Sequence, residues 1–144
     1  MMNIFEELCD EVFCEHIELH RIDIPVEGMS AVYIRSAGKE RIFMRDDGTE
    51  NENACWLAEE LGHHYTGPSR VLHYNAADDW RAEAKARRWA HARILTPDAI
   101  RTAARNTDDI YEIADALCVT VDFLMEAISD YITKGLWPSS PAAL

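Results

Sequence analysis

The sequence predicts an α+β domain, in which a short β-rich segment separates an N-terminal amphipathic helix from a series of later helices. Residues 3–17 place apolar side chains on one stripe and acidic side chains opposite, as in a surface helix. Residues 22–44 combine strand-forming and turn-forming residues, whereas apolar residues recur at helical spacing after residue 50. A chain of 144 residues is long enough to bury the core of one domain.

Three strands are predicted in the β-rich segment. Residues 22–26 form a short edge strand, because Pro25 lacks the N–H group that a central strand needs. Residues 31–35 and 41–44 flank the turn-forming residues 36–40, and this arrangement predicts a hairpin.

Four helices are predicted after the strands. The first runs from about residue 50 to residue 65 and stops at Gly67-Pro68, a pair that ends helices. The second runs from residue 80 to about residue 94, with Asp78-Asp79 as its N-terminal cap. Two more helices lie between residues 107 and 134.

These elements divide the chain into a main domain, residues 1–96, a helical pair packed on it, residues 97–137, and a flexible tail, residues 138–144. The pair has the length of a helix-turn-helix. Its second helix, however, carries three acidic residues and no Arg or Lys before Lys134, so DNA phosphates would repel it. We therefore expect packing on the main domain and no direct contact with nucleic acid.

The charge balance and the cysteines restrict the function further. The chain has 26 acidic and 14 basic residues and a net charge of -12, which suits a basic partner or a metal cation and disfavours nucleic acid or an anionic membrane. No window has the run of roughly 18 apolar residues of a membrane span, and the N-terminus lacks the positively charged region and long apolar stretch expected of a signal peptide. The four cysteines form no C-x-x-C pair, so we expect free thiols in the cytoplasm.

Residues 54–67 carry the strongest functional signal, because an apolar helix here includes Glu59, Glu60, His63 and His64. Residues four apart stack on one helix face, so Glu59 lies over His63 and Glu60 over His64. The pattern differs by one residue from H-E-x-x-H, the helix in which two histidines bind zinc and the glutamate acts on water. Glu59 stands where that motif has its first histidine. Solvated side chains are the alternative, but ionisable groups on an apolar helix need a partner or a metal.

A hydrolytic zinc needs three protein ligands and one open position. Glu59 and His63 would supply two of them. The third is Glu83 on the next helix, with His73 in the loop between the helices as its rival. Taken alone, Glu83 is more simply interpreted as a solvated helix glutamate.

The remaining histidines have simpler interpretations. His16 and His20 stand four apart, but they lie where the first helix gives way to a strand, so we expect them on the surface. His91 lies two turns beyond Glu83 and is predicted to be structural. His64 adjoins the motif, and its part in the site stays open.

The stretch 57–66, followed by Glu83-Ala-Lys-Ala-Arg-Arg-Trp-Ala90, resembles the ImmA/IrrE family of metallopeptidases. A C-terminal run from Ile110 to Ile128 is similar to the family's ending, and the resemblance spans roughly residues 20–135. It implies a zincin-like metallopeptidase domain, a bound zinc ion, and cleavage of a helix-turn-helix repressor that silences a phage or mobile element.

Carried over residue by residue, the resemblance puts the metal ligands at Glu59, His63 and Glu83 and the general base at Glu60. One histidine and two glutamates around a dication sum to zero charge, whereas two histidines and one glutamate leave +1. The extra negative charge weakens the Lewis acidity of the metal and shifts the preference from zinc toward manganese or iron(II).

Two functions of different classes follow. The first is a cytoplasmic, metal-dependent endopeptidase that cleaves a repressor, in which Glu60 accepts a proton from the attacking water. The alternative is a non-catalytic antirepressor or regulatory binding protein that retains the fold, with Glu59 marking the loss of cleavage.

Overall fold

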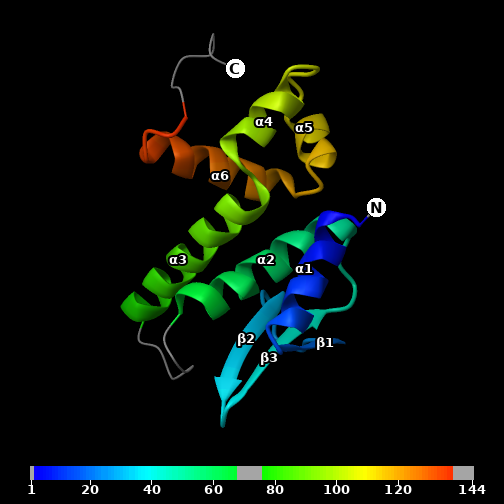
Figure 1. The fold of residues 1–144 in the computed structure, drawn as a ribbon, viewed down its shortest axis with the longest axis vertical. Coiled ribbons are helices and arrows are strands. Elements are labelled where there is room, and N and C mark those ends of the chain that lie inside the picture. Colours follow the sequence, from blue (N-terminus) through cyan, green and yellow to red (C-terminus); the bar gives the residue numbers. More distant parts are fainter. Residues whose placement is uncertain (1, 68–75, 138–144) are drawn as a thin grey trace.

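The structure is a computed structural model that describes residues 2–67 and 76–137. Within these residues the chain forms three strands and six helices (Figure 1), in the order α1 (Ile4–Cys14), β1 (Glu18–Ile22), β2 (Ala31–Ser36), β3 (Lys39–Arg45), α2 (Glu50–Thr66), α3 (Ala76–Ile94), α4 (Pro97–Ala104), α5 (Ile110–Ala116) and α6 (Val121–Thr133). The predicted α+β class is confirmed. The sheet lies at one end of the molecule under α1 and α2, and α4 to α6 gather at the far end of α3 (Figure 1).

The sheet has the strand order β1-β3-β2. β1 runs parallel to β3, and β2 runs antiparallel to β3. An edge strand does precede the hairpin, but the predicted range 22–26 is wrong, because the strand is Glu18–Ile22. It pairs with β3, for example with Leu19 opposite Ile42, and this contact joins distant parts of the chain. Because the strand is short and charged, its own sequence gives little indication that it is a strand.

The hairpin is tighter than predicted. Its strands extend to Ser36 and Lys39, and the turn residues Ala37 and Gly38 have φ values of 52° and 76°. Two consecutive residues with positive φ make the turn whose twist matches that of the flanking strands. In the strand order β1-β3-β2, β2 forms one edge of the sheet.

Two capped helices cover the sheet. The side chain of Asn3 accepts from the N–H of Glu6 at 2.9 Å, and that of Thr49 accepts from the N–H of Glu52 at 3.1 Å. In each case the glutamate side chain accepts from the cap residue's own N–H, so both α1 and α2 begin with a capping box. The fully buried core between these helices and β3 consists of Leu8, Ile42, Met44, Leu57 and Leu61.

The later helices differ from the prediction in two places. α3 begins at Ala76, so Asp78 and Asp79 lie within the helix and are not its cap. α4 was not predicted, although Thr96 and Pro97 provide a cap and a first-turn proline, and the Thr96 hydroxyl oxygen accepts from the N–H of Ala99 at 3.1 Å. α4 therefore precedes the predicted helical pair, which corresponds to α5 and α6. None of the helices in the described residues is long and apolar enough to cross a membrane.

Two contacts place α6 against the rest of the chain. The hydroxyl of Tyr131 donates to the carbonyl of Leu95 at 2.6 Å, and both residues are buried. At the other end of α6, the hydroxyl of Thr120 lies 3.9 Å from the Sγ of Cys55 on α2. Cys55 is one of the four cysteines, all of which are free thiols as predicted.

Candidate functional site

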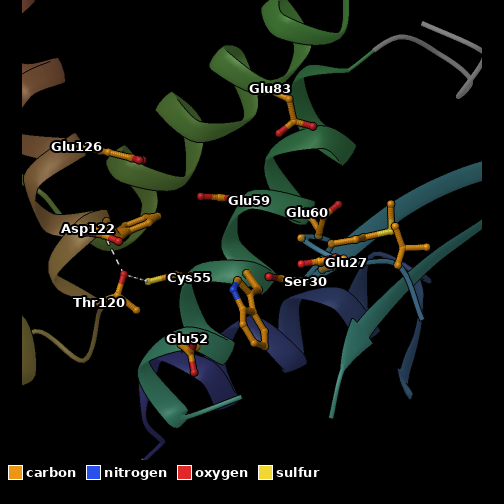
Figure 2. A pocket seen from close by; sticks show the side chains of 16 residues that line it. Glu27, Ser30, Glu52, Cys55, Glu59, Glu60, Glu83, Thr120, Asp122 and Glu126 are labelled. Carbon is orange, nitrogen blue, oxygen red and sulfur yellow. Dashed lines mark hydrogen bonds between the residues drawn. The ribbon is translucent and has the colours of Figure 1, made fainter. Parts of the chain in front are cut away.

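The four ionisable residues of the α2 motif point in different directions. Figure 2 shows Glu59 projecting toward Glu126 of α6, whereas Glu60 projects on another side, toward the segment that carries Ser30. This divergence follows from the helical repeat, which separates neighbouring side chains by about 100°. Their stacking partners one turn later, His63 and His64, are likewise separated.

Gly62 allows α3 to approach the motif. It is a buried glycine inside a helix, and a Cβ atom added to it would meet the backbone carbonyl of Ala86 on α3. A glycine at this point lets the two backbones cross in close contact, at a modest cost in helix propensity. Because Gly62 precedes His63 and Ala86 lies one turn after Glu83, the crossing brings these two side chains together.

His63 and Glu83 are in direct contact. The Nε2 atom of His63 lies 3.1 Å from Oε1 of Glu83. Burial by itself lowers the pKa of His63, but the hydrogen bond to Glu83 and the nearby carboxylates of Glu60 and Glu59 outweigh it, so the pKa is raised. The same hydrogen bond lowers the pKa of Glu83. The structure thus unites two of the three predicted metal ligands.

Glu59 stands apart from that pair. Burial raises the pKa of its carboxyl to about 7, Glu126 and Glu83 add to the rise, and Arg87 opposes it. Within residues 2–67 and 76–137, no group of three or more His, Cys, Asp or Glu side chains is arranged to hold a metal ion. Glu59, the remaining member of the predicted ligand set, points its side chain toward α6 (Figure 2).

Glu60 is the most deeply buried of the motif carboxyls, with 8% of its surface exposed. Burial raises its pKa to about 8, with further contributions from Glu83 and Glu59, whereas His63 and a hydrogen bond from the backbone of Tyr33 lower it. A carboxyl group with a strongly raised pKa at the edge of a cavity is a candidate for proton transfer.

A cavity of about 580 Å³ adjoins Glu59 and Glu60. It lies between α2, the start of α6 and residues 26–31, the segment before β2, and it also reaches Glu83. Two of the acidic residues that line the cavity, Asp122 and Glu126, were not predicted as site residues. In the sequence they served only as evidence that the last helix does not bind DNA. Their spacing of four does place them on one face of α6.

The other histidines lie outside this cavity. His64 has Nε2 at 2.8 Å from Glu15 and Nδ1 at 2.6 Å from Glu40, so it joins α1 to the hairpin. His91 is buried, stacks edge-on against Phe123 and has a pKa lowered by burial, as suits a structural residue.

Of the predicted surface histidines, His16 is exposed and His20 is half-buried, 3.2 Å from Glu18. His73, the rival third ligand, lies outside the described residues.

Comparison with known proteins gives one match. The Peptidase_M78 family, described as the IrrE N-terminal-like domain, matches residues 14–129. This range includes α2, α3 and α6 as far as Ser129, and with them the acidic residues that line the cavity. No curated protein and no solved structure matches the chain.

Proposed function

The chain belongs to the Peptidase_M78 family of IrrE N-terminal-like domains, and from this premise we propose that it is a metal-dependent endopeptidase of a zincin-like type. Membership confirms the resemblance to the ImmA/IrrE family and supports a metallopeptidase. We further propose a helix-turn-helix repressor of a phage or mobile element as its substrate, in the cytoplasm, with no direct binding to nucleic acid.

The contact between His63 and Glu83 carries this proposal. A nitrogen and a carboxylate oxygen 3.1 Å apart, from two helices that cross at a glycine, are donors that a divalent cation can share. Glu59 lies four residues before His63, a spacing that places the two Cβ atoms about 5–6 Å apart. Rotation of the Glu59 side chain away from α6 would complete a set of one histidine and two glutamates. Zinc fits this set, and manganese or iron(II) also fits its oxygen content.

The donor set also suits a cation electrostatically. Glu59, Glu60 and Glu83 are three carboxyl groups close together, and burial raises the pKa of the first two to about 7 and about 8. A nearby positive charge favours the ionised form of such groups. When bound, a divalent cation supplies Lewis acidity to the attacking water and to the scissile carbonyl.

The chain's own residues do the rest of the chemistry. Glu60, ionised in the field of the cation, accepts the proton of the attacking water and passes it to the departing amine. The cavity beside Glu60 binds the substrate, and β2, an edge strand whose residue Ala31 lines that cavity, offers backbone groups to an extended peptide.

Incubation of the purified protein with its cognate repressor tests the proposal. We expect cleavage by the wild type, loss of cleavage in excess chelator, and a rate lower by about 100-fold or more for Glu60→Gln. Glu7→Gln, which removes an exposed acid on α1, is the matched control and should cleave as the wild type does. Equal cleavage by wild type and Glu60→Gln would exclude Glu60 as the base.

A non-catalytic antirepressor is the second candidate function. It is favoured by Glu59, which replaces a histidine of the H-E-x-x-H motif, and by the orientation of its side chain toward α6. This candidate predicts a stable complex with an uncleaved repressor, formed equally well by the wild type and by Glu60→Gln.

A further inference from the structure

The cavity beside the motif is lined by carboxylates from several elements. They come from the segment before β2 (Glu27), the first turn of α2 (Glu52) and the start of α6 (Asp122 and Glu126), in addition to Glu59, Glu60 and Glu83. In Figure 2 these acids surround the opening on opposite sides, with Glu27 across from α6. No Lys, Arg or His is among the described residues that line it.

This negative charge is only partly balanced within the protein. Glu83 contacts His63, and Glu126 lies 3.9 Å from Arg87 in a pair that is half exposed. A dication held by Glu59 and Glu83 would offset the charges of those two residues alone. The carboxylates of α6 and of the opposite segment would still give the cavity a negative potential, which a recessed site focuses.

Glu60 places a buried carboxyl group on the wall of the cavity. Its side chain lines the cavity with 8% of its surface exposed, and the backbone of Tyr33 hydrogen-bonds to it. A carboxyl group has more hydrogen-bonding capacity than this one contact uses, and the remainder is available to a polar ligand in the cavity.

The apolar part of the lining suits a long side chain. Trp56 from α2 and Phe123 from α6 line the same cavity, together with Val26 and Met29. Lysine and arginine bury their aliphatic stems against such surfaces while the charged end reaches polar groups, and both are attracted to aromatic faces.

We propose that this cavity takes a basic peptide segment, with the cationic end of a Lys or Arg side chain between Asp122 and Glu126 of α6 and Glu27 across the cavity. The inference rests on the proposed peptidase function and deepens it by naming the substrate class. Asp122 and Glu126 are specificity-determining residues here, distinct from the proposed metal ligands and base.

Peptide binding by the full-length protein tests the inference. The probes are two fluorescein-labelled alanine octapeptides, one with two arginines and one with two citrullines, the neutral isostere of arginine. Their binding is measured by fluorescence anisotropy at low salt. We expect the arginine peptide to bind about 10-fold more tightly than the citrulline peptide, and Asp122→Asn with Glu126→Gln to remove that preference. Mass spectrometry of the recovered peptides records any cleavage separately.

The matched control is Glu7→Gln with Glu112→Gln. Like Asp122, both residues are exposed acids in the first turn of a helix, and the change in net charge equals that of the test variant. The control should retain the arginine preference within about twofold. Equal loss in both double variants, equal binding of both peptides, or binding of neither would overturn the inference. Thermal melting of each variant verifies folding.

The two proposals can fail separately. Selective arginine binding without any cleavage would support the basic-peptide site and count against the peptidase. Repressor cleavage by a protein that binds both peptides equally would overturn the inference and leave the peptidase function standing.

Discussion

His63 and His64 are neighbours in the sequence, and each contacts carboxylates, but those carboxylates belong to different parts of the molecule. His63 meets Glu83, on the side of α2 where Glu59 and Glu60 have raised pKa values beside an acidic cavity. His64 lies between Glu15 and Glu40, each within 3 Å of a different ring nitrogen. Both side chains are largely buried, with 13% and 11% exposed.

The contrast separates the proposed functional surface from a structural one. Around His64 the acidic groups have partners, and the adjacent Tyr65 donates to Glu11, which also pairs with Arg93 of α3 at 3.1 Å. Around His63 the carboxyls outnumber the cations, an arrangement that costs stability unless a ligand supplies positive charge. Such local conflicts are expected at functional sites, where stability is given up for binding.

The largest expected effect distinguishes the two histidines by metal affinity. His63→Ala should weaken binding of zinc by about 100-fold or more, because it removes one of three proposed donors. His64→Ala should change the affinity by about threefold at most, since its contacts lie on the other side of α2. Titration against a competing chelator measures both. Similar losses in the two variants would contradict the distinction.

The helix crossing is the next place to test the comparison. Gly62→Ala places a methyl group against the backbone of Ala86, so α3 must shift, and we expect a loss of about 2 kcal/mol in the free energy of unfolding. The same shift should separate Glu83 from His63 and weaken metal binding. Urea unfolding gives the stability. The control must exchange glycine and alanine at a position without a close neighbour. Gly38→Ala is unsuitable, because the positive φ of Gly38 would strain an alanine. Ala116→Gly, at an exposed helical position on α5, serves as the control.

A smaller loss is expected on the structural side of α2. His64→Ala should lower the free energy of unfolding by about 1–2 kcal/mol, since the partly exposed Glu15 and Glu40 lose a shared partner but Arg35 still pairs with Glu40 at 3.2 Å. Urea unfolding in chelator measures the loss without any contribution from metal. An unchanged stability would mean that the ion pairs contribute nothing net.

A further effect concerns pH in the metal-free protein. The Glu60 carboxyl has a folded pKa of about 8 against an ordinary value of 4.5, so its contribution is fully present below about pH 4.5 and is lost as the pH rises through 8. Melting temperatures measured in chelator should fall over this window, and Glu60→Gln should flatten the decline. A rise in melting temperature over the same window would have the wrong sign.

The sequence alone determined the features that depend on local spacing. The helical repeat stacked Glu59 over His63, the turn residues between two apolar runs indicated the hairpin, and Glu83 in the following helix was available as a partner. β1 could not be placed, because its position follows from parallel pairing with β3, in which paired residues such as Glu18 and Arg41 stand 23 positions apart.

The tertiary structure decided what each of these residues faces. Gly62 lets α3 cross α2 at close range, which selects His63 for contact with Glu83, while α1 and the hairpin take His64. Packing of α6 turns Asp122 and Glu126 toward the cavity. The physical reason is that a helix repeat determines which side chains share a face, whereas the surroundings of that face depend on elements that arrive from distant parts of the chain.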